Sequence, residues 1–397
     1  MSQHAPSQLA APIFGATLSR LLLNTARRFT YPFAPALSRG LGVPLTAVTS
    51  LIAINQVTCL LGALIGPLTD RIGYRKMMIA GISLMAAGML AAACLPTYAV
   101  VLVALFLAGL GKNIFDPAVQ AWAGDRVAYH RRALVIGILE ISWSASTLIG
   151  IPLVAILMDH YGWQSPFLVM GGLGVVAAIA LAMIIPVDNH PPAGRDAWSW
   201  SSYLRTYTGL IGDKPVLGIL GYAFFVSMGN DNLFVVYGAW LERDFGLSLV
   251  ALGMGTGLIG VAELAGEGFT ALVADRFGLK RALVIGLSAT AMSYLCLPLL
   301  GFSPAAALVG LAVLFFVFEF SMVTSLSLCT EMMPGSRATM MAGFMAAAGI
   351  GRVIGALMGG AVWQSGGIVA TGWLSAGLTV TGLLCLVVGL KGRGDAG

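Results

Sequence analysis

Charged and amide side chains stand inside long apolar stretches of this 397-residue chain, where they could recognise a polar solute or carry protons. The first half holds a mainly basic group: Asn24, Arg27, Arg28, Tyr31, Lys112, Asn113 and Asp116. The second half holds a mainly acidic group with one cation: Asn230, Asp231, Tyr237, Glu319 and Arg352. An ionisable group in an apolar span is costly unless it faces a cavity or a partner. We therefore predict that these residues bind a small solute.

Some of these charges have a simpler interpretation as ion pairs inside one half. Lys112 and Asp116 are four residues apart, so they would meet on one helix face and could pair with each other. Arg352 could likewise pair with Glu319 or Asp231. These alternatives stay open at the level of the sequence.

The arginines near the N-terminus are expected to differ in their surroundings. Arg20 lies towards one end of its apolar stretch, and we expect its long side chain to reach the aqueous interface. Arg27 and Arg28 are adjacent and cannot share one helix face. At least one of these two is therefore expected to face the cavity.

The elements that must position these residues are membrane-spanning helices. Hydrophobic residues make up 58% of the chain and charged residues 10%, whereas a soluble domain carries about 25% charged residues. Apolar runs close to the roughly 20 residues of a membrane span recur along the whole chain. Twelve segments are predicted: 9–38, 44–67, 77–95, 98–122, 133–158, 163–186, 215–241, 247–272, 281–300, 303–328, 338–362 and 367–390. All should be helices, because an open strand edge cannot be satisfied in lipid.

The predicted fold class is therefore an all-α polytopic membrane protein made of two six-helix bundles. The bundles are assigned to residues 1–190 and 215–397, and the polar segment 191–214 joins them. Most of the 22 Lys and Arg residues fall in loops on one side of the predicted spans, which places both termini and the joining segment in the cytoplasm. The net charge of +5 is thus a topology signal, and no nucleic acid is expected as a partner.

Two charged turns repeat about 205 residues apart and show a tandem duplication. Residues 66–76 read GPLTDRIGYRK, and residues 272–281 read LVADRFGLKR. A second repeat keeps nearly the same offset: Asp125, Arg131 and Gly137 against Glu331, Arg337 and Gly343. Two copies of one unit predict two halves with the same topology.

The turns resemble the G-x-L-a-D-R-x-G-R-K loop between the second and third helices of the major facilitator superfamily. The second copy has Ala271 where the leading glycine would stand. The resemblance covers the whole chain and implies a secondary transporter that works by alternating access. It also implies a conformational latch at these turns: Gly66, Asp70, Arg71, Gly73, Arg75, Arg131, Asp275, Arg276 and Arg337. The alternative is that the basic turns only fix the topology.

Within the superfamily the chain resembles twelve-helix drug and sugar efflux permeases. Ser146, Gly150 and Pro152 match part of the glycine–proline motif in the fifth helix of these exporters. Leu105 stands where their fourth-helix arginine would be, which speaks against a proton relay built on that arginine.

This resemblance implies proton-coupled export of a small, amphipathic organic solute across the inner (plasma) membrane. Protons and membrane lipids are the other expected partners, and the protein is expected to act as a monomer. Uptake of an anionic metabolite is the alternative that Arg27, Arg28 and Lys112 favour. Translocation of a lipid or lysolipid is a further alternative.

A carboxylate that carries protons must titrate near physiological pH. Burial raises a carboxylate pKa and a nearby cation lowers it, so a solute that competes for the cation would promote protonation. Asp231 is the first candidate, because Asn230 and Asn232 give it a polar setting. Glu319 is the second and Glu263 the third. In the resembled fold the first, fourth, seventh and tenth helices line the cavity.

No cofactor, metal site or enzymatic chemistry is predicted. The cysteines are scattered singly in apolar runs: Cys59, Cys94, Cys296, Cys329 and Cys385. Gly255, Gly257 and Gly260 spell GxGxxG but lie inside a predicted span with no preceding strand. These glycines are expected to allow close helix contact. The same is expected of Gly351, Gly355 and Gly359, which follow one another at intervals of four residues.

Overall fold

The computed structural model describes residues 6–127, 129–186, 212–332 and 337–391, and these residues form helices without strands. The first half contains α1 (Pro6–Arg28), α2 (Ala34–Leu41), α3 (Leu45–Ile72), α4 (Tyr74–Cys94), α5 (Tyr98–Arg126), α6 (Tyr129–Ala145), a π-helical turn (Ser146–Gly150), α7 (Ile151–Tyr161) and α8 (Ser165–Ile184). The second half contains α10 (Lys214–Phe234), α11 (Tyr237–Phe245), α12 (Leu249–Phe277), α13 (Leu279–Cys296), a 3-10 turn (Leu297–Leu300), α14 (Pro304–Met332) and α15 (Arg337–Gly389).

Each of the twelve expected segments falls on one of these helices or on helices that meet at a break. The last two segments both lie in α15, which leaves helical geometry at Gly366 and Gly367. Among the described residues, nine helices are long and apolar enough to cross a membrane, or ten if the bent pair α2 and α3 counts as one span. Most of the expected joining segment, 191–214, lies outside the described residues.

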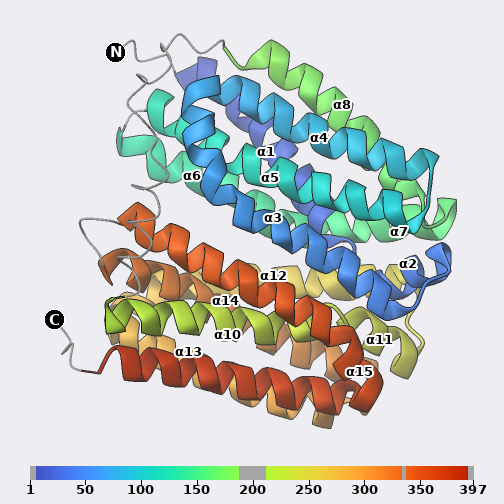
Figure 1. Cartoon of the computed structure of the whole chain (residues 1–397), viewed down its shortest axis with the longest axis vertical. Coiled ribbons are helices and arrows are strands. Elements are labelled where there is room, and N and C mark those ends of the chain that lie inside the picture. Colours follow the sequence, from blue (N-terminus) through green and yellow to red (C-terminus); the bar gives the residue numbers. More distant parts are fainter. Residues whose placement is uncertain (1–5, 128, 187–211, 333–336, 392–397) are drawn as a thin grey trace.

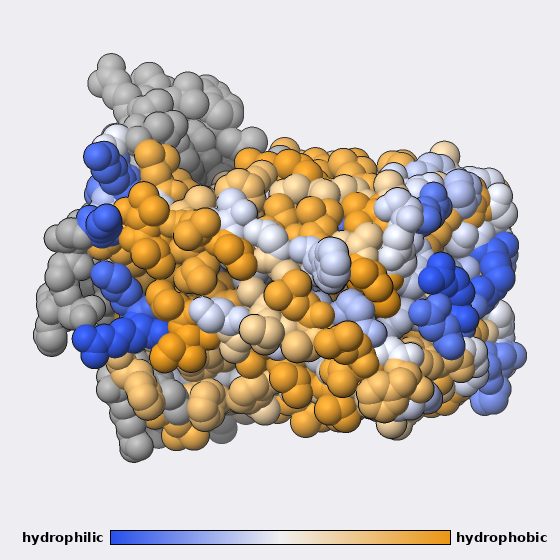
Figure 2. Space-filling model, turned by 90° about the horizontal axis from the view of Figure 1, so that it is seen from below, coloured by the Kyte–Doolittle hydropathy of each residue, from blue (hydrophilic) through white to orange (hydrophobic). Residues whose placement is uncertain are grey.

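The outer surface carries a broad apolar band between two hydrophilic ends (Figure 2). Large apolar side chains are well exposed on it, such as Phe14 at 66%, Met183 at 80% and Val388 at 68%. A surface of this kind is stable against lipid and not against water. The protein is therefore a multi-pass membrane protein.

The helices form two bundles, α1–α8 and α10–α15, that lie side by side (Figure 1). They meet along two seams. In one, α3 packs against α15; in the other, α12 packs against α6, the π-helical turn and α7. Helices α2 and α11 also pack together at the end far from both termini, where Arg39 and Glu242 form an ion pair (Figure 1).

Glycines let the helix backbones approach closely, as expected from their spacing. Gly351, Gly355 and Gly359 of α15 face α10, where a Cβ would collide with backbone carbonyl oxygens. A Cβ at Gly260 of α12 would stand 2.9 Å from the backbone nitrogen of Leu148 in the other half. The GxGxxG spelling therefore belongs to a helix seam, which confirms the expected close helix contact.

The first helix of each half is broken near its middle. α1 ends at Arg28 and α2 begins at Ala34, while α10 ends at Phe234 and α11 begins at Tyr237. Tyr31 lies in the first break, and Tyr237, at the second, is its equivalent in the repeat. The two breaks bring polar side chains to the surface between the halves.

Candidate solute-binding site

A central cavity lies between the halves and is lined by three arginines, three carboxylic acids, two amides and five aromatic side chains. The lining residues are Arg27, Arg28, Tyr31, Gln56, Trp143, Asn230, Asp231, Phe234, Glu263, Phe315, Phe318, Glu319 and Arg352. The cavity volume is about 40 Å³, which is room for a water molecule or two. Pockets for drug-sized ligands measure about 300–1,000 Å³, so an organic solute would require the halves to part.

Asp231 of α10 joins the two halves on the side of the cavity near α3 and α15. Its Oδ1 accepts a hydrogen bond from the Tyr31 hydroxyl at 3.2 Å and lies 3.5 Å from Nε2 of Gln56. Its Oδ2 lies 3.9 Å from Nε of Arg352. The buried Asp231 carboxylate thus has two neutral hydrogen-bond partners and one cation at a longer distance.

Arg27 turns towards α3 and is held by neutral groups. Its Nε donates to Oδ1 of Asn55 at 3.1 Å, and its Nη2 donates to Oε1 of Gln56 and to Sγ of Cys59. Asn55 is fixed in turn, because its amide donates to the carbonyl oxygen of Leu105 at 2.8 Å. Within the described part of the chain, no carboxylate forms an ion pair with Arg27.

Arg28 turns to the opposite side, towards α6 and α12. Its Nη2 lies 2.6 Å from Oε1 of Glu263, and both side chains are at most 5% exposed. Oε2 of Glu263 accepts a hydrogen bond from Thr147 in the π-helical turn at 3.3 Å. The Arg28 guanidinium lies 4.3 Å from the ring centroid of Trp143, a cation–π contact that helps a buried charge. Both adjacent arginines thus line the cavity, because their side chains diverge.

Glu319 of α14 lies on the same side as Glu263. A Cβ at Gly266 of α12 would stand 3.3 Å from the Glu319 Cβ, so the glutamate packs directly on the α12 backbone. Its side chain lines the cavity. Among the described residues, nothing forms a hydrogen bond or ion pair with it.

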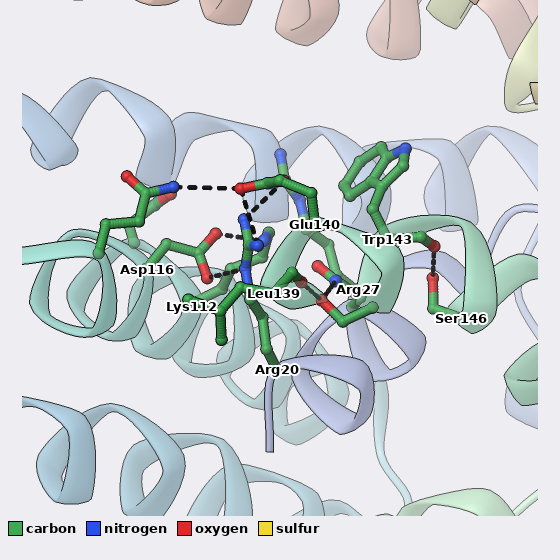
Figure 3. Close-up of polar contacts among 12 residues, drawn as sticks. Arg20, Arg27, Lys112, Asp116, Leu139, Glu140, Trp143 and Ser146 are labelled. Carbon is green, nitrogen blue, oxygen red and sulfur yellow. Dashed lines mark hydrogen bonds and ion pairs between the residues drawn. The ribbon is translucent and has the colours of Figure 1, made fainter. Parts of the chain in front are cut away.

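A second charge group, called here the N-half cluster, consists of the buried Arg20 and Lys112 with Asp116, Gln120 and Glu140, of which Glu140 is 48% exposed. Figure 3 shows the Arg20 guanidinium between two carboxylates: its Nε lies 3.0 Å from Asp116 and its Nη1 2.8 Å from Glu140. Lys112 pairs with the other Asp116 oxygen, and Gln120 donates to Glu140 at 3.2 Å. The expectation that Arg20 reaches water is wrong, because acids from α5 and α6 pair with it and leave it 5% exposed.

Seven of the predicted solute-binding residues line the cavity: Arg27, Arg28, Tyr31, Asn230, Asp231, Glu319 and Arg352. The three proton-carrier candidates, Asp231, Glu319 and Glu263, also line it.

Five predicted solute-binding residues have their partners elsewhere. Lys112 and Asp116 belong to the N-half cluster. Asn24 donates to Ser142 and Asn113 donates to Thr58, so both amides are used inside the first half. The Tyr237 hydroxyl lies 2.9 Å from Oγ1 of Thr256. The structure therefore places these five outside the lining of the cavity, and Lys112 and Asp116 form the ion pair that their spacing allowed.

Gln56 and Trp143 line the cavity although the sequence did not single them out. The adjacent amides Asn55 and Gln56, alone in an apolar span, were a usable signal for the first. Trp143 gave no such signal, because tryptophan is common in membrane helices. No group of three or more His, Cys, Asp or Glu side chains suited to a metal ion occurs in the described ranges.

The turn expected to act as a latch is described only in part. Gly73 links α3 to α4 with φ 99°, a conformation that favours glycine. Arg75 Nη2 donates to the carbonyl oxygen of Ala182 on α8. The remaining latch side chains lie outside the described part of the structure: Gly66, Asp70, Arg71, Arg131, Asp275, Arg276 and Arg337.

A family model described as Major Facilitator Superfamily matches residues 16–222 and 219–395. The chain therefore belongs to the major facilitator superfamily, a family of transporters. It is 24% identical over 391 residues to an uncharacterized MFS-type transporter, YwfA, of Bacillus subtilis (strain 168), with 97% of this chain and 92% of that one covered. It is 27% identical over 242 residues to the chromaffin granule amine transporter of Rattus norvegicus, over 60% of this chain and 45% of that one.

Solved structures share the fold. A peptide transporter POT in complex with alafosfalin superposes with a TM-score of 0.81 at 13% identity, over 98% of this chain and 96% of that one. A bacterial homologue of the human lysosomal transporter Spinster superposes with a TM-score of 0.76 at 14% identity, over 97% and 96%. Identities this low show the fold alone.

Proposed function

We propose that this protein exports a small, amphipathic organic solute across the plasma membrane in exchange for protons. The observation that carries the proposal is Glu319, which lines the central cavity with no described partner. Glu319 is half-buried, and a carboxylate withdrawn from water is costly unless it holds a proton or faces a cation. A proton and a cationic group of the solute would compete for this one carboxylate, and such competition drives exchange in opposite directions.

Aromatic side chains around Glu319 suit the apolar part of such a solute. Phe315 and Phe318 come from the same helix, and the ring of Phe234 lies 5.2 Å from that of Phe315. The similarity to a protein named as an amine transporter supports a cationic group on the solute. Aromatic faces also attract cations.

Alternating access would come from rocking of the two halves along the seams α3–α15 and α12–α6/α7. The cytoplasmic side would hold both termini, the 191–214 segment and the latch turns around Asp70 and Asp275. Glu263 is already paired with Arg28 across the seam. We assign this pair to alignment of the halves of a monomeric transporter, which leaves Glu319 as the proton carrier for export and Asp231 as the carrier for uptake.

Uptake of an anionic metabolite is the second candidate, and the Asp231–Arg352 contact favours it. At 3.9 Å this contact is loose, so an anion could take the guanidinium and leave the carboxylate to bind a proton. Solute and proton would then bind together and move in the same direction.

The two candidates make different predictions for flux in proteoliposomes. A thermal-shift screen of amphipathic amines, carboxylates and lysolipids on the purified protein selects the transported probe. Flux driven by a pH gradient is then compared with probe exchange at equal pH and saturating probe. For export, Glu319→Gln should reduce gradient-driven flux at least about tenfold while exchange continues. For uptake, Asp231→Asn should do so instead.

The direction of the gradient gives an independent check. Export requires that acidification of the external side drives the probe outwards, whereas uptake requires that it drives the probe inwards. If both variants keep full gradient-driven flux, neither carboxylate carries the proton and the proposal fails.

A further inference from the structure

The charges of the central cavity are separated along the interface between the halves. Three arginines face three carboxylic acids, so the cavity as a whole is balanced. The balance does not hold on each side, however, because Arg27 and Arg28 diverge from α1 towards different helices.

The side formed by α3, α10 and α15 has an excess of cations. Arg27 and Arg352 stand there with Asp231 as the one lining carboxylate. Asp231 is shared with Tyr31 and Gln56, and Arg352 approaches it only to 3.9 Å. The Arg27 guanidinium is held by amides and a thiol, with no described carboxylate in pairing distance. One positive charge therefore remains without a counter-charge on this side.

The side formed by α6, α12 and α14 has an excess of acids. Arg28 and Glu263 neutralise each other at 2.6 Å. Glu319 also lines this side, and its carboxylate has no partner in the described structure. One negative charge therefore remains here, if Glu319 is ionised.

Apolar rings meet in the cavity between α10, a helix of the cationic side, and α14, a helix of the acidic side. Phe234 of α10 and Phe315 of α14 both line the cavity, with ring centroids 5.2 Å apart. A solute that meets both charges must therefore carry its own charges at either end of an apolar or aromatic body.

We propose that the solute is an amphipathic zwitterion, with its anionic group on Arg352 and Arg27 and its cationic group on Glu319. This inference rests on the proposed function only in taking the central cavity as the solute site. A solute with a single charge would displace water and leave the opposite excess unpaired, which is costly away from water. A zwitterion matches both, and the site should therefore discriminate strongly against its singly charged analogues.

Three probes on one scaffold test the inference by equilibrium binding to the full-length protein in nanodiscs. They are para-(aminomethyl)phenylacetate, which is zwitterionic, para-tolylacetate, which is anionic, and para-methylbenzylamine, which is cationic. We expect the zwitterion to bind at least about tenfold more tightly than either analogue, which corresponds to about 1.4 kcal/mol.

Variants then assign each charge to its partner. Glu319→Gln should weaken the zwitterion and the amine but not the carboxylate, so that the zwitterion binds no better than para-tolylacetate. Arg352→Gln should weaken binding of the zwitterion and of the carboxylate but not of the amine, so that the zwitterion binds no better than para-methylbenzylamine. Arg352→Lys keeps the charge and should keep most of the preference, which separates recognition from a defect in folding. Glu242→Gln removes a carboxylate outside the cavity and serves as the matched control, with all three affinities within about twofold of the unmodified protein.

The inference is overturned if the zwitterion binds no better than its better analogue, or if Glu319→Gln weakens all three probes equally. These outcomes are distinct from failure of the proposed function, because binding is measured without a pH gradient. If the zwitterion binds about tenfold more tightly but no flux follows a pH gradient, the inference about the solute stands and the proposed proton coupling fails.

Discussion

The N-half cluster and the central cavity hold the same kinds of side chain, yet they differ in how completely the charges are paired. In the cluster, Arg20 and Lys112 meet Asp116 and Glu140, and each charge has an opposite charge within 3.0 Å. In the cavity, Glu319 has no described partner and Arg352 reaches Asp231 only at 3.9 Å. The first group is closed inside one half, whereas the second lies where two halves meet.

This difference separates structural charges from those available to a solute. A buried pair is expensive to break, because removing one partner leaves the other charge uncompensated. A charge without a partner can be removed at little cost to folding. Its presence is therefore explained by function and not by stability. Pairing, and not burial or residue type, is therefore the property that marks Glu319 as a candidate for function.

The largest effect on stability is expected from breaking the N-half cluster. Arg20→Gln would leave Asp116 and Glu140 with Lys112 as the one cation near them among the described residues. The expected cost is about 3 kcal/mol, the lower end of the range for a buried pair, because Glu140 is 48% exposed. Thermal unfolding of the detergent-purified protein measures this loss. Arg39→Gln, which breaks an ion pair whose arginine is 62% exposed, should cost less than about 1 kcal/mol.

A double variant sharpens the same prediction. Arg20→Met combined with Asp116→Leu leaves Lys112 and Glu140, one charge of each sign. It should recover most of the lost stability, since a buried pair can often be replaced by apolar side chains. If the double variant is as unstable as Arg20→Gln alone, charge balance is not what holds the cluster.

A somewhat smaller loss is expected for Arg28→Gln. Among the described residues, Glu263 would keep its hydrogen bond from Thr147, and the adjacent cavity can admit water to the carboxylate that loses its cation. We expect a cost of about 2–3 kcal/mol, and Arg28→Lys should restore more than half of it. If Arg28→Gln leaves the free energy of unfolding unchanged, the Arg28–Glu263 pair does not stabilise the fold and both charges are available to a solute.

Tyr31→Phe should have a modest effect, about 1 kcal/mol, because one hydroxyl donor to Asp231 is lost. Tyr237→Phe is the matched control at the equivalent position of the repeat, where the hydroxyl contacts Thr256 within the same half. Both should lower stability similarly in unfolding measurements. Only Tyr31→Phe should change gradient-driven flux, and equal effects of the two on flux would remove Tyr31 from the coupling site.

Glu319→Gln should change the unfolding free energy least, by less than about 0.5 kcal/mol in either direction, because no described partner is lost. The same variant is expected to lose gradient-driven flux, so stability and transport should separate most clearly here. A loss of stability comparable to that of Arg20→Gln would mean that Glu319 is paired in the folded protein. The contrast between the N-half cluster and the cavity would then be wrong.

The amino-acid order alone determined the membrane-spanning helices, the duplication and the family. Runs of apolar residues near the length of a bilayer leave the backbone no alternative to helices, and the repeated turns around Asp70 and Asp275 reveal the two halves. The breaks in α1 and α10, by contrast, bring Tyr31 and Phe234 together across the interface (ring centroids 4.4 Å apart), a contact that residue order alone does not reveal.

Sequence spacing identified the intramembrane charges but could not assign their partners. Lys112 and Asp116 pair at the spacing of one helix turn, which a sequence can reveal. Arg20 and Arg28 have partners that are about a hundred or more positions away, and Glu319 packs on Gly266, which is more than fifty positions away.

The sequence thus decided that charges would be buried, because their positions along each helix are fixed by residue order. Only the tertiary structure decided which of them are neutralised. Ion pairing depends on distances of a few ångströms between helices, and a rotation of α1 by one residue would turn Arg27 to the direction that Arg28 now faces. The unpaired state of Glu319 is therefore a property of the packed molecule.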